Sequence, residues 1–526
     1  MRVRRSLLDL QSEYENGNKL PLETVMRAWK GIKELPPTDP DSYFVIAGYH
    51  GEPFRGAGWG SSSYWGGYCN HGNVLFPTWH RAYLMRLEDA MRTIPGCADV
   101  ALPFWDETSP ESLANGIPWA LTVETFELDG QSIPNPLRSY AMQRNIVDHL
   151  SPFPDADYGK PTGYKTVRYP LSGLVGPADI AKTNAHNAQF PDYAKNVAIL
   201  NANIVNWLSG TVTIDGDVLH PNIQAKYAKC LDAPNYTVFS NTTSAAEWND
   251  NAPARAVPIE SPHNSIHLAV GGFDLPSINQ DFSEIPGANG DMGENDTASF
   301  DPIFFFHHCF VDRVFWLWQQ RHQATDALEI IAGYPGTNSV DNQGPTPGTP
   351  ANSWLDLDSP LDPFLRTNGA AQTSRDVVDI EGQLGYTYGP GSLDELAAPP
   401  AAALAVTERT GPALRVSGIN RGRIAGSFVI EAYVESGDGP RLIGEESVLS
   451  RWHVEGCANC QTHLLASAVF ELPEPIATAF TEGPAAAPNV SIAVRTRDGR
   501  LGGALEAAPA ALAEVAAKAH FRIEIR

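Results

Sequence analysis

Six histidines fall into two groups whose spacing suits a metal site. The first group, His50, His71 and His80, lies near the start of the chain, and the second, His263 and His267 with one of the adjacent His307 and His308, lies in its middle third. His263 and His267 are four residues apart, so one face of a helix can direct both rings at one ion. Imidazole ligands without carboxylates or thiolates favour copper or zinc over magnesium or calcium, and the absence of an HExxH motif argues against a zinc protease.

The segments that carry these histidines are predicted to be helices. Helical patterning runs from Leu20 to Leu35 and from Trp79 to Met91, and in the second segment His80 shares one face with Leu84, Leu87 and Met91. We therefore expect His80 to point into a helical core.

A further helix is predicted from Pro302 to about His322. Pro302 suits the first turn, and Asp301 is a candidate cap. Because Asp312 follows His308 by one helical turn, its carboxylate could orient the ring of His308 as a ligand.

Each histidine by itself has a simpler interpretation. An isolated HxxxH pair or a pair of adjacent histidines is more often an ordinary surface or core feature than a metal site. Six imidazoles on apolar helical segments are different, because six polar groups would need partners inside a core. A shared metal ion would satisfy them together.

Composition excludes several classes of protein. The 526 residues include 37 basic and 61 acidic side chains, giving a net charge of −24, so no basic face for nucleic acid is expected. Apolar runs stay shorter than the roughly 20 residues of a membrane-spanning helix. The basic start of the chain lacks the apolar stretch of a signal peptide, so we expect a cytoplasmic protein or one whose leader is missing.

The chain changes character towards its C-terminus. Residues 103–261 are rich in Pro, Asn and Gly and are expected to form long loops with short helices. An Ala/Pro-rich run near residues 396–405 is the clearest linker. Beyond it, short segments rich in β-branched residues predict a separate β-sandwich.

Two motifs make the chain resemble the tyrosinases, catechol oxidases and molluscan-type haemocyanins. The first-copper motif of that family is matched by His71, Phe76, Trp79-His80-Arg81 and Glu88. The second-copper motif is matched by Asp301-Pro302, Phe304, His308 and Asp312, which leaves His307 off the ligand position. LPFWD at residues 102–106 and YTY at residues 386–388 also agree with the family.

The resemblance implies a mainly α protein in which a four-helix bundle with long surrounding loops holds two copper ions, with dioxygen as co-substrate. The first copper would be held by His50, His71 and His80, and the second by His263, His267 and His308. We expect a catalytic domain over residues 1–390, a linker over 391–408 and a β-sandwich covering domain over 409–526.

The resemblance also suggests roles for residues around the copper ligands. Cys69 and His71 have the Cys-x-His spacing of a thioether, the alternative being a buried free thiol. Glu260 and Asn264 would hold a water that takes the proton of a phenol; otherwise Glu260 compensates the charge of a helix N-terminus and Asn264 makes a local hydrogen bond. Asn295 falls at the substrate entrance, where the family usually has an apolar residue.

In the C-terminal segment, Cys457 and Cys460 form a CxxC pair. In fungal-type relatives such a pair is thought to help deliver copper, and thiolates suit cuprous ion. A structural disulfide or two thiols without a function are the alternatives.

The implied activity is that of a tyrosinase, which hydroxylates small phenols at the ortho position and oxidises the resulting diphenols to o-quinones. The C-terminal domain is expected to keep the enzyme latent. A catechol oxidase that accepts only diphenols is the alternative among enzymes, and a haemocyanin-like oxygen-binding protein is the alternative of another class. The sequence does not specify an oligomeric state.

Overall fold

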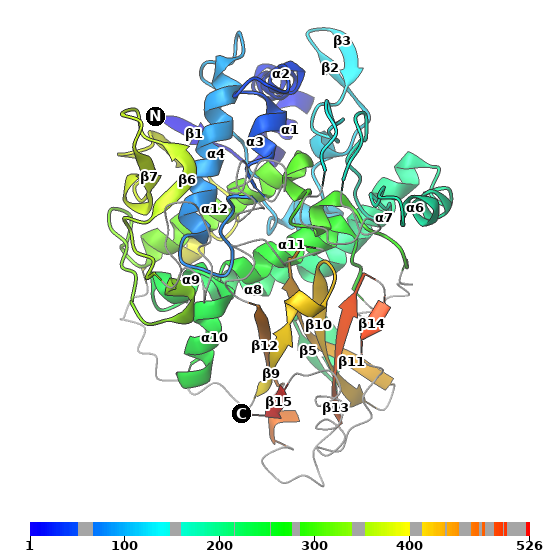
Figure 1. The fold of residues 1–526 in the computed structure, drawn as a ribbon, viewed down its shortest axis with the longest axis vertical. Coiled ribbons are helices and arrows are strands. Elements are labelled where there is room, and N and C mark those ends of the chain that lie inside the picture. The colour runs from blue at the N-terminus through cyan, green and yellow to red at the C-terminus, as the bar shows by residue number, and fades with distance from the viewer. Residues whose placement is uncertain are drawn as a thin grey trace.

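The computed structural model describes the chain except for residues 51–66, 148–158, 215, 253, 276–284, 339–352, 400–412, 437–438, 452–463, 473–475, 479–488, 498, 502–521 and 526. A helical part takes up most of the chain, and strands from the C-terminal segment gather at one end of it (Figure 1). In the described residues, no helix is both long enough and apolar enough to cross a membrane.

Within the described residues, the α-helices whose bounds are given below lie between residues 7 and 321. They are α1 (Leu7–Glu15), α2 (Leu20–Glu34), α3 (Tyr43–Ala47), α4 (Phe76–Thr93), α5 (Pro110–Asn115), α6 (Ile180–Asn187), α7 (Tyr193–Ser209), α8 (Ile223–Cys230), α9 (Tyr236–Ser240), α10 (Thr242–Asn251), α11 (Glu260–Gly271) and α12 (Ile303–Arg321). The predicted helices at residues 20–35, 79–91 and 302–322 correspond to α2, α4 and α12. The region expected to hold only short helices also contains α7, which is 17 residues long.

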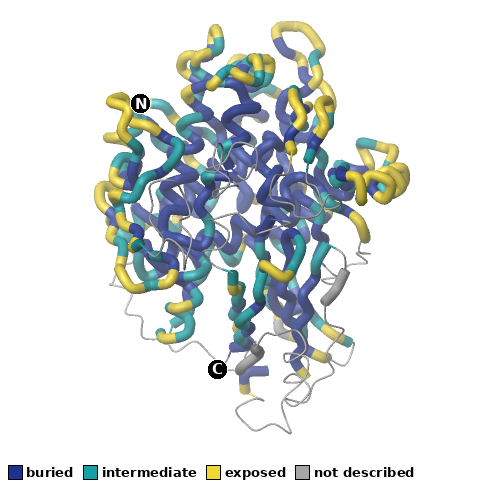
Figure 2. Tube along the Cα trace, in the orientation of Figure 1, coloured by how far each residue is buried: buried dark blue, intermediate teal, exposed yellow. Residues whose placement is uncertain are grey.

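Four helices form the frame of the helical part. α2 packs on α4, α4 on α12, and α12 on α11. The predicted inward face of α4 is buried, since His80, Leu84, Leu87 and Met91 are at most 2% exposed. Buried positions run through the centre of this part, whereas exposed positions lie in its outer loops and hairpins (Figure 2).

Short strands also occur in the chain before the C-terminal segment. They are β1 (Arg2–Arg4), β2 (Thr125–Leu128), β3 (Gln131–Pro134), β4 (Val212–Ile214), β5 (Asp217–Leu219), β6 (Pro360–Leu365), β7 (Ala371–Thr373) and β8 (Tyr386–Tyr388). β1 pairs in parallel with β8, with Arg4 opposite Tyr388. This pairing fastens the start of the chain to the YTY segment.

The C-terminal segment forms two sheets. Its strands are β9 (Ala413–Asn420), β10 (Phe428–Ser436), β11 (Gly439–Val448), β12 (Leu465–Glu471), β13 (Val490–Thr496), β14 (Gly499–Leu501) and β15 (Arg522–Ile525). One sheet has the order β11-β10-β13-β14 and the other β12-β9-β15. β11 contacts β12 of the other sheet and also lies against α11.

The start of the predicted linker packs on the helical part. The backbone amide of Ser392 donates to Asp106 Oδ2 at 2.8 Å, and Arg313 forms an ion pair with Asp394. Ordered contacts with the helices therefore extend at least to residue 394.

Candidate metal centre

The second group of histidines converges where α11 meets α12. His263 and His267 lie on α11 and His308 lies on α12. The Nε2 atom of His308 lies 3.2 Å from the Nε2 atom of His263 and 3.2 Å from that of His267. All three side chains are buried, so three ring nitrogens meet at one enclosed point.

Hydrogen bonds at the far side of two rings fix which nitrogen faces this point. His263 Nδ1 donates to Asn264 Oδ1 at 2.9 Å, and His267 Nδ1 donates to the carbonyl of Met292 at 2.9 Å. In a neutral imidazole the other nitrogen, Nε2, then carries a lone pair. Two lone pairs and the Nε2 of His308 face one another, and a shared cation would satisfy all three.

The first group of histidines makes a similar arrangement beside α4. The ring centroids of His50, His71 and His80 are 5.2 to 5.4 Å apart. His80 Nδ1 donates to the carbonyl of Phe76 at 2.8 Å, which leaves its Nε2 as the atom with the lone pair. The Nε2 atoms of His71 and His80 are buried and have no hydrogen-bond partner among the described residues.

The two groups face each other. The rings of His80 and His308 stack with centroids 4.6 Å apart, and those of His71 and His263 are 5.7 Å apart. Burial holds the pKa of each of these histidines below its ordinary value, and that of His80 at about 3. Neutral imidazoles are the form that binds metal ions.

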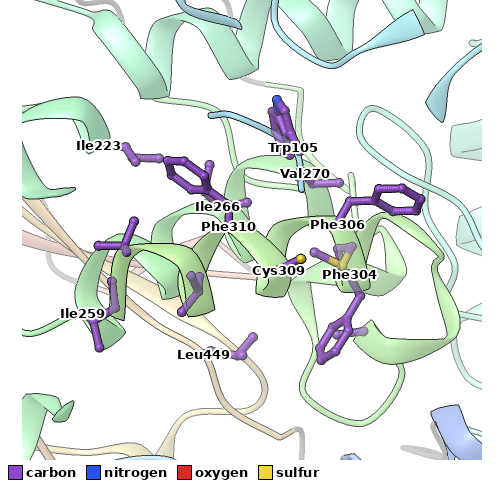
Figure 3. Close-up of a cluster of buried hydrophobic side chains, with 14 of the residues drawn as sticks. Trp105, Ile223, Ile259, Ile266, Val270, Phe304, Phe306, Cys309, Phe310 and Leu449 are labelled. Atoms are coloured by element: carbon purple, nitrogen blue, oxygen red, sulfur yellow. The ribbon is translucent and has the colours of Figure 1, made fainter. Parts of the chain in front are cut away.

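An apolar shell surrounds the histidines. The Phe304 ring stacks on His308 with centroids 3.9 Å apart, and the Phe76 ring lies 4.9 Å from that of His263. Figure 3 shows the hydrophobic packing around α11 and α12, which includes Leu449 from the C-terminal segment. The rings are therefore held by packing as well as by hydrogen bonds.

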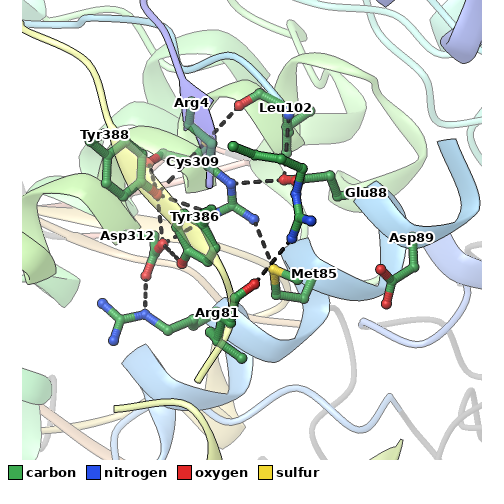
Figure 4. A network of polar contacts seen from close by, with 12 residues as sticks. Arg4, Arg81, Met85, Glu88, Asp89, Leu102, Cys309, Asp312, Tyr386 and Tyr388 are labelled. Atoms are coloured by element: carbon green, nitrogen blue, oxygen red, sulfur yellow. Dashed lines mark hydrogen bonds and ion pairs between the residues drawn. The ribbon is translucent and has the colours of Figure 1, made fainter. Parts of the chain in front are cut away.

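The prediction that Asp312 orients His308 is wrong. Asp312 Oδ1 accepts from Arg81 Nε at 2.6 Å, and its Oδ2 accepts from the hydroxyls of Tyr386 and Tyr388 at 2.6 Å each (Figure 4). Arg4 completes the set, with Nη1 3.2 Å from Oδ2. Burial by itself would raise the pKa of Asp312, but Arg81 and Arg4 lower it overall. Two buried arginines and two phenols thus outcompete a neutral imidazole for this carboxylate.

A buried carboxylate beside His307 was not predicted from the sequence. Glu107 Oε1 lies 2.6 Å from His307 Nδ1, and Glu107 Oε2 accepts from the Tyr227 hydroxyl at 2.7 Å. Burial raises the pKa of Glu107 well above its ordinary value. His307 has a ring nitrogen within 4.8 Å of those of the second group, but its Nδ1 is occupied by Glu107. Glu107 follows LPFWD directly, and no spacing rule links it to a histidine 200 residues away.

Cys69 and Asn295 lie beside the first group. Ligand atoms of Cys69, His50 and His71 lie within 4.8 Å of one another, and burial raises the pKa of the Cys69 thiol to about 11. The Asn295 side chain is buried and its Nδ2 lies 3.5 Å from Cys69 Sγ. The backbone amide of Asn295 donates to the carbonyl of Ser450, so the C-terminal segment covers this position.

Glu260 lies at the start of α11, and both of its carboxylate oxygens accept hydrogen bonds. Oε1 accepts from the Gly72 amide at 2.7 Å, and Oε2 accepts from the amide and hydroxyl of Thr242 at 2.8 and 2.9 Å. Burial raises the pKa of Glu260. The bond to Gly72 ties the start of α11 to the residue after His71.

Asn264 connects the second group to the C-terminal segment. Its Oδ1 accepts a hydrogen bond from His263 Nδ1, while its Nδ2 donates to the carbonyl of Ser447 at 3.2 Å. The predicted copper-delivery residues Cys457 and Cys460 lie outside the described residues.

Two groups of three buried imidazoles, facing each other between helices, define a class of proteins that can hold two metal ions side by side. The family model of the common central domain of tyrosinase matches residues 40–321. A tyrosinase from Hahella sp., HcTyr2, is 52% identical over 495 residues, covering 90% of this chain and 88% of that protein. A tyrosinase from Aspergillus oryzae is 49% identical over 507 residues, covering 90% and 89%.

A solved structure shows the same fold. The tyrosinase from Burkholderia thailandensis at low pH superimposes with a TM-score of 0.81, at 48% identity and over 100% of both chains. The chain belongs to the tyrosinase family. Members of that family are type 3 dicopper proteins, and this chain is accordingly a copper oxidoreductase.

Proposed function

We propose that the two groups of histidines hold two copper ions, the first by His50, His71 and His80 and the second by His263, His267 and His308. The supporting observation is the convergence of the Nε2 atoms of His263, His267 and His308, two of which are fixed as lone-pair donors. Six neutral imidazoles in a buried apolar site are a donor set that suits copper. Copper bound there would supply the activation of dioxygen.

The reaction that we propose is the ortho-hydroxylation of a small phenol followed by oxidation of the catechol. Together these steps convert one phenol and one dioxygen into one o-quinone and one water. The phenol must lose its hydroxyl proton, and Glu260 with Asn264 would position the water that accepts it. Burial favours proton uptake by Glu260, and the bond from Gly72 fixes its carboxylate beside His71.

The C-terminal segment would keep this site latent as a β-sandwich cover. The carbonyl of Ser447 accepts a hydrogen bond from the side-chain amide of Asn264, and the carbonyl of Ser450 accepts one from the backbone amide of Asn295. Arg451 fastens the same stretch through an ion pair with Asp296, with Nη1 2.8 Å from Oδ1. Moving this stretch away would free the Asn264 amide for water and uncover Asn295 at the entrance.

We also propose that Cys69 forms a thioether with His71 when copper is loaded in the presence of dioxygen. The closeness of their ligand atoms supports the bond. The thiol hydrogen and one ring hydrogen would pass to dioxygen, giving hydrogen peroxide, so the product would be lighter than the unmodified chain by two hydrogens, and mass spectrometry of the peptide that contains both residues would detect it. Copper delivery by Cys457 and Cys460 is a further part of the proposal.

The experiment that tests the proposed reaction uses copper-loaded protein, cut within residues 389–405, beside the intact chain. Each is given tyramine without a catechol and, in a separate assay, a catechol without tyramine, and quinone formation is followed in both. Fast hydroxylation by the cut protein and slow reaction by the intact chain are expected. Turnover of a catechol alone would make the protein a catechol oxidase, and bound copper without turnover of either substrate would favour an oxygen carrier.

A further inference from the structure

An open pocket lies apart from the six histidines. Its volume is about 580 Å³, and it is lined by α2, α7 and the chain segments at residues 134–141 and 165–171. Pockets for small molecules commonly have volumes of 300 to 1,000 Å³, so an organic molecule fits this space. No copper ligand lines the cavity, and the proposed reaction does not use it.

The charge of the cavity is opposite to that of the whole protein. Two acidic side chains line it, Glu34 and Glu124, against five basic ones: Lys30, Lys33, Arg138, Lys165 and Arg168. The protein as a whole carries a net charge of −24. An excess of basic groups in a concave site raises the local concentration of anions.

Lys33 is a donor placed for an anion. Its ammonium donates to the carbonyl oxygens of Pro136 and Ser139 at 2.5 and 2.7 Å, and these bonds use two of its three N–H groups. Burial lowers the pKa of Lys33 to about 7, with Asp301 and Arg168 as the charged groups that face it. An anion beside the ammonium would favour its charged form.

The other basic residues differ in how far they are already neutralised. Arg168 pairs with Asp301, with Nη2 2.6 Å from Oδ1, and both are buried. Lys165 is exposed and has no ion-pair partner within the described part of the chain. Lys30 pairs with Glu34 and Arg138 with Glu124, so Lys33 and Lys165 are the charges most available to a ligand.

The walls of the cavity also offer aromatic and apolar surface. Tyr140 and Tyr193 line it together with Leu200. The guanidinium of Arg138 lies over the Tyr193 ring, 3.7 Å from its centroid, so it covers that face of the ring and replaces it with the flat surface of the guanidinium. A flat apolar molecule can stack on such a surface, while an inorganic anion cannot use it.

We propose that this cavity binds a small aromatic carboxylate. The carboxylate would accept the remaining N–H of Lys33 and lie near Lys165, and the ring would stack on the Arg138 guanidinium, on the side away from Tyr193. A ligand of this kind uses both the basic groups and the flat guanidinium surface, which neither a neutral aromatic molecule nor a mineral anion does.

The test titrates 2-naphthoate into the full-length, copper-loaded chain by isothermal titration calorimetry. Saturable binding at one molecule per chain is expected, and the neutral isostere 2-naphthamide should bind at least tenfold more weakly. Lys33→Met and Lys165→Glu should each weaken binding at least fivefold. Lys165 is exposed, so its substitution leaves folding intact even if Lys33→Met does not.

Lys182→Met is the matched control, because Lys182 is an exposed lysine on α6 outside the cavity. It should leave the affinity for 2-naphthoate unchanged. Absence of saturable binding would overturn the proposal. Equal binding of the amide, or binding that Lys165→Glu leaves unchanged, would overturn it as well, since the anion would then be held elsewhere.

Discussion

Arg81 donates through Nε to Asp312 Oδ1 across 2.6 Å, and both side chains are buried. Arg81 follows the proposed ligand His80 on α4, and Asp312 follows His308 by one turn of α12. One ion pair therefore joins the two helices that bring the histidine groups face to face, and Arg4 and the two tyrosines of β8 share its carboxylate.

Replacing Asp312 by Asn should destabilise the protein strongly. The change leaves Arg81 and Arg4 buried without their shared negative charge, and breaking a buried pair in this way costs about 3–5 kcal/mol. Urea unfolding followed by circular dichroism measures the loss. The control is Asp89→Asn, because Asp89 pairs with Arg92 at the surface and should contribute less than about 1 kcal/mol. Equal effects of the two substitutions would contradict the proposed role of Asp312.

His263→Ala should halve the copper content of the loaded protein. The substitution removes one of the three nitrogens that meet beside His308 and leaves the first group intact. Copper per chain is measured by inductively coupled plasma mass spectrometry after dialysis. His220→Ala, which removes an exposed histidine, should retain the full content. An unchanged copper content in His263→Ala would argue against this ligand set.

Glu260→Gln should slow phenol hydroxylation far more than catechol oxidation. General base catalysis typically contributes about 10²–10⁴-fold, and only the phenol reaction is proposed to depend on this carboxylate. Initial rates with tyramine and with a catechol, both measured on the cut protein, give the ratio. Glu247→Gln, on the exposed surface of α10, should keep the ratio of the parent protein. A parallel fall of both rates in Glu260→Gln would assign the residue a structural role only.

Arg451→Ala should raise the activity of the intact chain towards tyramine. Arg451 and Asp296 form a buried ion pair that fastens the stretch next to Asn295, so its loss weakens the closed arrangement. Lys229→Ala is the comparison, since it removes an exposed ion pair with Glu471 between the same two parts of the chain. If Arg451→Ala were no more active than Lys229→Ala, the contacts around Ser450 would not control access.

The copper-free protein should lose stability as the pH falls from 7 to 5. Burial lowers the pKa of the site histidines, that of His80 to about 3, so at these histidines the folded chain binds fewer protons than the unfolded chain below pH 6.5. The unfolding free energy then decreases by up to about 1.4 kcal/mol per pH unit for each such histidine. Thermal melting at several pH values measures this trend, and a melting temperature independent of pH would contradict it.

Residue type and spacing sufficed to predict the two groups of histidines, four of which lie on α4, α11 and α12, whereas the resemblance to the family was needed to choose His308 over His307. The partner of Asp312 could not be predicted in this way. Arg4 lies 308 residues away in sequence and reaches Asp312 only because β1 pairs with β8. Glu107 likewise contacts His307 through packing of distant segments. Spacing along a helix indicates which side chains are close, but it does not decide between competing hydrogen-bond partners.

The central claim is that each histidine group holds one copper ion. A crystal structure of the copper-loaded chain, with anomalous scattering measured at the copper edge, tests it most directly. Two peaks are predicted, one among His50, His71 and His80 and the other among His263, His267 and His308, with His307 still bonded to Glu107. A single peak, or a peak ligated by His307 in place of His308, would contradict the account.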